Sequence, residues 1–140
     1  MTSQQGRGGC LCGSVQFRAA ACNTHVGACH CSMCRKWGGG PFFTVDCGTD
    51  VVFEGEESIG VYSSSDWAER GFCTQCGSHL FYRLKGSGQT MIPAGLFDDL
   101  SAPVFDHQVF IDEKPGWYDF SNATENMTGE EVFAAFAAQD

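Results

Sequence analysis

The sequence has few positive charges. Of its 140 residues, eight are lysine or arginine and seventeen are aspartate or glutamate, for a formal net charge of −9. The eight cations are dispersed, whereas proteins that bind nucleic acids through phosphates carry clustered lysines and arginines. The composition therefore argues against DNA or RNA as a partner.

Long apolar runs are also lacking. No run approaches the roughly 20 residues of a membrane-spanning helix, and the first five residues, MTSQQ, are polar and unlike a signal peptide. We therefore expect no membrane partner and a location in the reducing cytoplasm. Clustered cysteines there bind metals or act in catalysis more often than they form disulfides. The odd total of nine cysteines also fits poorly with complete disulfide pairing.

Seven of the nine cysteines lie in three short clusters. Thiolates at Cys-x-Cys or Cys-x-x-Cys spacing bind tetrahedral zinc readily, because both sulfurs fall on one side of a turn. Two remote pairs supply a complete set of four ligands and predict a closed, structural zinc site. This four-cysteine group consists of Cys10, Cys12, Cys73 and Cys76. A redox pair at Cys73 and Cys76 is the alternative, but such a pair belongs at a helix start in an α/β chain, and the flanks here indicate turn and strand.

The other cluster, Cys29, Cys31 and Cys34, forms a three-cysteine group that is one ligand short of a closed site. An open fourth position is typical of a catalytic metal, so we expect a reactive zinc here that leaves room for a substrate thiol. Two alternatives stay open. His30 is a possible fourth ligand, and Cys22, Cys47 or a histidine could close a second structural site. Otherwise Cys22 and Cys47 are expected to be buried small apolar residues.

Several residues near the three-cysteine group are candidates for substrate contact. Arg35 and Lys36 could hold a substrate carboxylate, or they are simply solvated surface cations. A pocket wall and core packing explain the nearby aromatic residues equally well; these are Trp37, Phe42, Phe43, Trp117 and Tyr118. His79, Arg83 and His107 are expected to be hydrogen-bonded structural residues.

Alternating polar and apolar residues predict short strands. The segments are 14–19, 42–47, 51–53, 59–62, 79–84, 90–95 and 105–112. Eighteen glycines favour turns over long helices, and residues 1–9 are expected to be a mobile lead-in. The fold class is therefore mainly β, with short antiparallel strands and short helices in a single domain over residues 1–140.

One helix is predicted near the end of the chain, over residues 129–138. Thr128 and Glu131 fit a capping box, and Val132, Phe133 and Phe136 form an apolar stripe at helical spacing. We expect this helix to pack on the sheet.

Three segments resemble the glutathione-dependent formaldehyde-activating enzyme (GFA) family, which is grouped with centromere protein V. They are GGCLCGSV at 8–15, CHCSMCRK at 29–36 and FCTQCGS at 72–78. Residues 111–117, IDEKPGW, also resemble a segment frequent in the family's bacterial members. The resemblance covers roughly residues 8–120 and places the cysteine motifs in the same order and spacing.

The resemblance implies a β-tent fold with a structural zinc on the four-cysteine group and a second zinc on the three-cysteine group. It also implies a carbon–sulfur lyase whose named reaction adds glutathione to formaldehyde and gives S-hydroxymethylglutathione. Two other classes of function stay open: a non-catalytic, zinc-stabilised binding module of the chaperone type, and a thiol redox or zinc sensor. The sequence indicates no oligomeric state.

Overall fold

The computed structural model describes residues 3–139 and is mainly β, with 44% of residues in strands and 19% in helices. The predicted fold class is confirmed. The chain forms two compact units, each built from separate stretches: Met1–Thr24 with Thr44–Pro103, and His25–Phe43 with Val104–Asp140. The prediction of a single domain is not tested by this division and stays a prediction.

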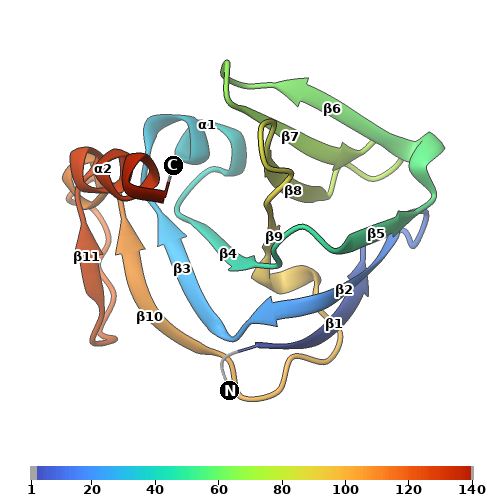
Figure 1. The fold of residues 1–140 in the computed structure, drawn as a ribbon, viewed down its shortest axis with the longest axis horizontal. Coiled ribbons are helices and arrows are strands. Elements are labelled where there is room, and N and C mark those ends of the chain that lie inside the picture. The colour runs from blue at the N-terminus through green and yellow to red at the C-terminus, as the bar shows by residue number, and fades with distance from the viewer. Residues whose placement is uncertain (1–2, 140) are drawn as a thin grey trace. The chain divides into compact units, whose positions relative to one another are not determined.

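The first unit contains a three-stranded antiparallel sheet in the order β1-β2-β5 (Figure 1). Its strands are β1 (Ser3–Gly9), β2 (Gln16–Asn23) and β5 (Val51–Glu54). The prediction of a mobile lead-in is wrong for residues 3–9, because β1 pairs with β2 along its length; residues 1–2 lie outside the described part. Gly8 packs so closely that a Cβ there would lie 1.9 Å from the Leu96 carbonyl oxygen, so this glycine permits close packing and does not signal mobility.

A second antiparallel array in this unit runs in the order β4-β9-β8-β7-β6. Its strands are β4 (Phe42–Asp46, in this unit from Thr44), β9 (Thr90–Pro93), β8 (His79–Leu84), β7 (Ala68–Cys73) and β6 (Ile59–Ser63). Short 3-10 helices follow β5 and β9, at Glu56–Ser58 and Ala94–Leu96.

The core of the first unit includes members of the four-cysteine group. One buried cluster consists of Cys10, Val15, Cys73, Leu80 and Phe81, and Cys76 packs against it. The thiols at this position therefore belong to the packed interior, where a bound ion would also be a structural element.

The second unit is built on three parallel strands in the order β11-β10-β3 (Figure 1). They are β3 (His25–Cys29), β10 (Val104–Val109) and β11 (Glu125–Met127). The expectation of antiparallel pairing therefore holds for the first unit and is wrong here. Polar and apolar residues alternate along a strand in the same way whether its neighbours are parallel or antiparallel. The alternation in the sequence therefore does not reveal the relative direction of paired strands.

Helices complete the second unit. They are α1 (Ser32–Gly38), a 3-10 helix (Ile111–Glu113) and α2 (Gly129–Gln139). Gly39, with φ of 90°, ends α1 in the left-handed conformation. The predicted capping box precedes α2: the Thr128 N–H donates to Glu131 Oε1 over 2.9 Å, and the Glu131 N–H donates to Thr128 Oγ1 over 3.2 Å.

The apolar stripe of α2 is only partly covered. Phe133 meets the Phe110 ring edge-on at 5.7 Å between ring centres, yet Phe133 and Phe136 stay 52% and 43% exposed. Within residues 3–139, no helix combines the length and apolar character needed to cross a bilayer.

Candidate metal centres

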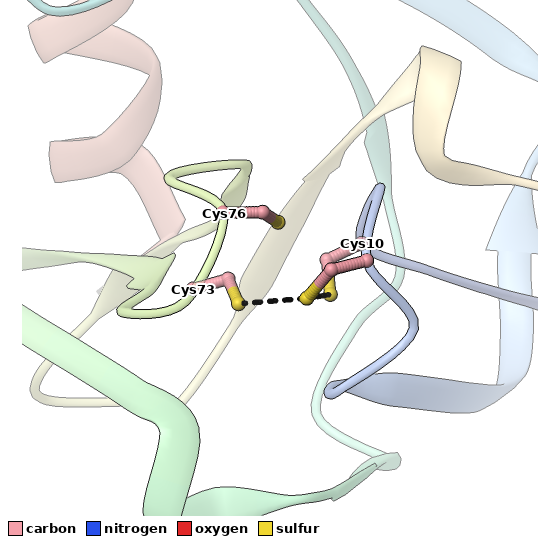
Figure 2. Close-up of side chains that lie close together, drawn as sticks. Cys10, Cys73 and Cys76 are labelled. Atoms are coloured by element: carbon pink, nitrogen blue, oxygen red, sulfur yellow. Dashed lines mark hydrogen bonds between the residues drawn. The ribbon is translucent and has the colours of Figure 1, made fainter.

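Two tight turns of the first unit carry the four-cysteine group. Cys10 and Cys12 lie between β1 and β2, while Cys73 ends β7 and Cys76 lies on the turn before β8. Gly77 has a φ of 80°, and its N–H donates to the Cys73 carbonyl over 2.8 Å, which closes the second turn. Figure 2 shows Cys10 facing Cys73 and Cys76 across the gap between the two turns.

The sulfur spacing suits a tetrahedral ion. The Sγ atoms of Cys10 and Cys12 are 3.7 Å apart, those of Cys12 and Cys73 are 3.8 Å apart, and all four sulfurs lie within 4.8 Å of one another. A tetrahedral zinc site with bonds of about 2.3 Å places its sulfurs about 3.8 Å apart, whereas a disulfide needs about 2.05 Å. All nine cysteines are free thiols, so the donor set fits a metal ion.

Neighbouring serines make two of the four thiols more acidic. Hydrogen bonds from the Ser78 side chain and backbone lower the pKa of Cys76 to about 5, and hydrogen bonds to Ser14 lower the pKa of Cys12. Burial raises the pKa of Cys73. Since a thiolate is the form that binds metal, this group is partly prepared for a divalent cation before the cation arrives.

The three-cysteine group lies where β3 passes into α1 in the second unit. Cys29 ends β3, Cys31 is the N-cap of α1, and Cys34 is buried in the first turn of that helix. The Cys31 sulfur accepts the Cys34 N–H over 3.4 Å. The three sulfurs lie within 4.8 Å of one another, and no other Cys, His, Asp or Glu of the described part of this unit joins them.

The three thiols crowd one another. Hydrogen bonds with Cys31 and Cys34, then burial, raise the pKa of Cys29 far above its ordinary value. Three adjacent thiolates repel one another in a partly buried site unless a cation lies among them. This group can therefore carry its full charge only with a positive ion bound, which is the behaviour of a metal site.

His30 lies between two of these cysteines but faces away from them. The side chain is fully buried; its Nε2 is 2.7 Å from Gln108 Oε1 and its Nδ1 is 2.6 Å from the Tyr118 hydroxyl. Because an amide oxygen only accepts, Nε2 donates to it, and the Tyr118 hydroxyl can donate to an unprotonated Nδ1, an arrangement that a neutral ring satisfies. Burial lowers the pKa of His30, in agreement with this state. Both nitrogens are thus engaged, and the alternative of His30 as fourth ligand does not hold in this geometry.

The predicted substrate contacts differ in availability. Arg35 donates from Nε to the His30 carbonyl over 2.9 Å, so part of its guanidinium supports the cysteine loop. Lys36 is exposed, and Trp37 packs edge-on against Phe42 at 5.6 Å between ring centres. A role of these residues toward a substrate stays a prediction.

The aromatic residues expected near the loop mostly pack on one another. Phe43 contacts the rings of Phe105 and Phe120 at 5.4 Å each, and Trp117 is 72% exposed beside Tyr118. None of the five aromatic candidates lines the cavity found in this unit; Phe120 does.

Cys22 and Cys47 are buried, as expected, and their sulfurs lie 3.4 Å apart in the first unit. Neither belongs to the three-cysteine group, so they do not close it. Arg83 pairs with Glu69 over 2.6 Å in a structural contact.

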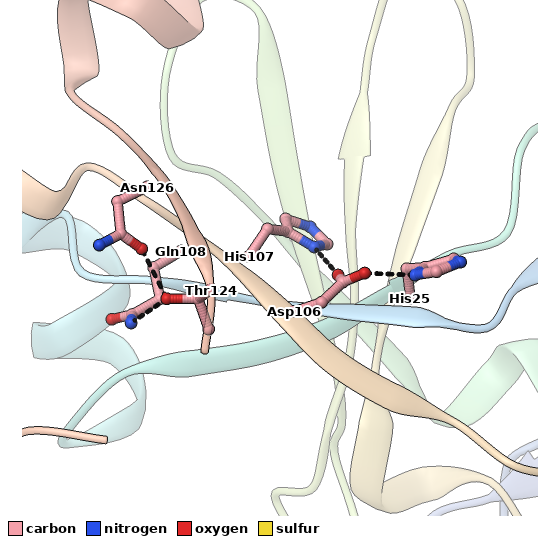
Figure 3. Close-up of polar contacts among 6 residues, drawn as sticks. All are labelled: His25, Asp106, His107, Gln108, Thr124 and Asn126. Atoms are coloured by element: carbon pink, nitrogen blue, oxygen red, sulfur yellow. Dashed lines mark hydrogen bonds and ion pairs between the residues drawn. The ribbon is translucent and has the colours of Figure 1, made fainter. Parts of the chain in front are cut away.

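A polar cluster on β3 and β10 was not predicted from the sequence. One carboxylate oxygen of Asp106 lies 2.9 Å from His107 Nδ1, and the other contacts His25 Nδ1 (Figure 3). The three residues come from strand segments about 80 positions apart, and nothing in the local sequence links His25 to Asp106. Hydrogen bonds with the two histidines lower the pKa of Asp106.

Fold and site together define a mainly β protein with two cysteine groups able to hold metal ions. The family described as glutathione-dependent formaldehyde-activating enzyme matches residues 5–113, and the chain belongs to this family.

Relatives in two organisms extend over most of the chain. An uncharacterized lyase of Schizosaccharomyces pombe is 38% identical over 126 residues, which cover 89% of this chain and 92% of that protein. A Halomonas elongata protein, provisionally named a glutathione-dependent formaldehyde-activating enzyme, is 26% identical over 130 residues, covering 85% of this chain and 83% of that protein.

The fold also occurs in a solved structure. A crystal structure of a Rhodobacter sphaeroides protein superposes with a TM-score of 0.58 at 21% identity, covering 68% of this chain and 90% of that one. At this identity the likeness concerns the fold alone.

Proposed function

We propose that the protein is a zinc-dependent enzyme of the carbon–sulfur lyase type that acts on a small thiol–aldehyde adduct, with glutathione and formaldehyde as the first candidates. Family membership supports this class, as do the two relatives named for lyase and formaldehyde-activating functions. The single observation that carries the proposal is the three-cysteine group, whose sulfurs converge without a fourth ligand from the described part of their unit.

The two cysteine groups would have different roles. Cys10, Cys12, Cys73 and Cys76 would hold a structural zinc in the core of the first unit, and Cys29, Cys31 and Cys34 would hold the reactive one. A zinc ion bound by three thiolates supplies a weak Lewis acid with one open coordination position, suited to a thiol.

The reaction itself is balanced without a further reagent. In the forward direction the thiol sulfur adds to the carbonyl carbon, one C–S bond forms and the carbonyl π bond breaks. The thiol proton ends on the new hydroxyl oxygen. The chain's contribution is to hold the cysteine loop: the buried His30 ring is fixed by Gln108 and Tyr118, and Arg35 holds the His30 carbonyl. This support keeps the three sulfurs converging, which is the preorganisation that catalysis requires.

Exchange NMR of glutathione with formaldehyde tests the proposal, because it measures both directions at equilibrium. Wild type should accelerate exchange in proportion to protein concentration, and Cys31→Ser should return it to the background rate. Ser32→Ala is the matched control, since Ser32 is exposed on the same turn and its backbone N–H, not its side chain, bonds Glu113. Equal rates for wild type and Cys31→Ser would refute the enzymatic role for this substrate pair.

Metal content supplies an independent readout. Wild type should contain two zinc ions per chain and Cys31→Ser one. A single tightly held zinc in wild type would favour the non-catalytic binding module. A metal-free three-cysteine group that pairs reversibly under peroxide would favour the redox sensor.

A further inference from the structure

The second unit contains a polar cavity of about 470 Å³. This volume is within the range of small-molecule sites. Its lining consists of Gln108, Ile111, Lys114, Asp119, Phe120, Asn122, Thr124 and Asn126. Six of these eight side chains are polar, and they include one cation and one carboxylate. Such a wall suits a polar ligand, and its lysine and aspartate offer partners for a ligand carboxylate and a ligand ammonium.

Lys114 is the least ordinary residue of the wall, because its side chain is only 13% exposed. Its Nζ lies 2.7 Å from Asp119 Oδ1 and 3.2 Å from the Pro115 carbonyl oxygen, and 5.2 Å from the centre of the Tyr118 ring. An ammonium has three donors, and within the described residues two acceptors lie against it. One donor is therefore left for a ligand, and a buried cation gains more from an added anion than a solvated one.

Asp119 is different, since its side chain is 84% exposed. Its carboxylate is free of packing and can turn toward an ammonium of the ligand. The ligand's carboxylate would then replace it as the counterion of the buried Lys114 ammonium. Together the two side chains offer a paired positive and negative charge at the edge of the cavity.

Three other lining residues are joined by a chain of hydrogen bonds (Figure 3). Gln108 Nε2 donates to Thr124 Oγ1 over 2.9 Å, and Thr124 Oγ1 donates to Asn126 Oδ1 over 2.7 Å. Because Asn126 faces Thr124 with its amide oxygen, its amide N–H groups point away from Thr124. Gln108 uses its amide oxygen on His30 and its amide nitrogen on Thr124, so in this chain of hydrogen bonds the Asn126 amide is the group that faces a ligand.

This cavity adjoins the residues that hold the three-cysteine group in place. Gln108 lines it and also accepts the hydrogen bond from His30 Nε2, and the Phe120 ring lies 6.1 Å from the His30 ring. Lining residues of the cavity therefore contact the residue between Cys29 and Cys31.

We propose that the cavity binds the zwitterionic, amino-acid-like end of the small thiol, with its carboxylate on Lys114 and its ammonium on Asp119. The assignment of this ligand as the substrate rests on the proposed function; the binding itself requires neither metal nor turnover. A neutral thiol such as 2-mercaptoethanol lacks both charges and would use the cysteine loop without the cavity.

The test uses S-methylglutathione, which keeps both charges and has no free thiol, titrated into ¹⁵N-labelled full-length protein. Amide shifts should concentrate in residues 108–126. The affinity should fall at least tenfold for the ligand's diethyl ester and for Lys114→Gln. Asp119→Asn is a second variant that places little demand on folding, because the residue is exposed, and it should weaken binding several-fold. Lys85→Gln is the control; this exposed lysine bonds Ser63 in the first unit and should leave affinity unchanged.

Two results would overturn the proposal: unchanged affinity in both Lys114→Gln and Asp119→Asn, or shifts confined to other parts of the chain. Repeating the titration with Cys31→Ser separates this proposal from the enzymatic one. Retained binding by a variant without exchange activity would support the cavity alone. Exchange activity in wild type without S-methylglutathione binding would support the enzymatic proposal and refute the proposal that the cavity binds the thiol.

Discussion

A partly buried histidine in β8 makes the stability of the protein depend on pH. Burial, and then the charge of Arg70, lower the pKa of His79 below its ordinary value of about 6.5. The unfolded chain therefore binds a proton at this residue at a higher pH than the folded chain does. It follows that stability is complete above about pH 6.5 and declines as the pH falls toward the folded pKa.

We expect His79→Gln to flatten this dependence. Urea unfolding at pH 7.5 and 5.5, with saturating zinc throughout, should give a smaller loss of unfolding free energy for the variant than for wild type. Parallel losses in the two proteins would mean that His79 does not contribute to the pH dependence.

At the scale of single residues, spacing along the chain predicts what is local. The convergence of Cys10 with Cys12, and of Cys29 with Cys31 and Cys34, follows from turn geometry. The partners of His30 do not, because Gln108 and Tyr118 lie 78 and 88 positions away. Contacts between segments far apart in the chain leave no pattern in the neighbouring sequence. The residues that hold the cysteine loop could therefore not be predicted from it.

Among the elements, β7 and β8 pair so that Gly71 lies opposite Phe81, and no room is left for a side chain at Gly71. A Cβ there would lie 2.2 Å from the buried Phe81 ring. Gly71→Ala should therefore destabilise the protein by about 1–3 kcal/mol through overpacking. Gly86→Ala is the matched control, since no atom lies within 4 Å of its added Cβ, and it should change stability by less than about 0.5 kcal/mol. Denaturant midpoints measure both, and equal midpoints would contradict the packing argument.

The capping box of α2 permits a test at a helix end. Thr128→Ala removes the hydroxyl that accepts the Glu131 N–H, so it should cost about 1 kcal/mol and speed amide exchange in the first turn. Thr128→Ser keeps the hydroxyl and should behave nearly as wild type. Exchange rates that do not differ between the two variants would show that the cap contributes nothing.

Sequence patterns identified the elements unevenly. The strand predicted at 79–84 coincides with β8, and the helix predicted at 129–138 with α2 to within one residue. By contrast β1 was missed, because its glycines and polar residues show no apolar alternation, and its pairing with β2 supplies the stabilisation. Likewise β7 has an arginine and a glycine buried at its centre, so it lacks alternation. Tertiary packing overrides local propensity in both cases.

For the molecule as a whole, chelation should destabilise the first unit through its core. Cys10 and Cys73 are buried among Val15, Leu80 and Phe81, so loss of the proposed zinc removes a cross-link from the packed interior and leaves its thiols to take up protons. If this costs about 3 kcal/mol, the melting temperature falls by about 10 °C in a chain of this length. Calorimetry of Cys31→Ser with and without EDTA isolates the four-cysteine group, because this variant lacks the second site. An unchanged melting temperature, with metal loss verified by analysis, would exclude a structural role.

The interleaving of the two units also imposes an order on synthesis. The chain passes between units near residues 24, 43 and 103. On the ribosome, the four-cysteine group of the first unit has emerged completely once residue 76 leaves the exit tunnel. Cys29, Cys31 and Cys34 emerge earlier than Cys73, yet their strand has no β10 to pair with until residue 104 and beyond appear. His30 in turn waits for Gln108 and Tyr118. The nascent protein therefore exposes the thiols of Cys29, Cys31 and Cys34 before the residues that hold their loop have been made.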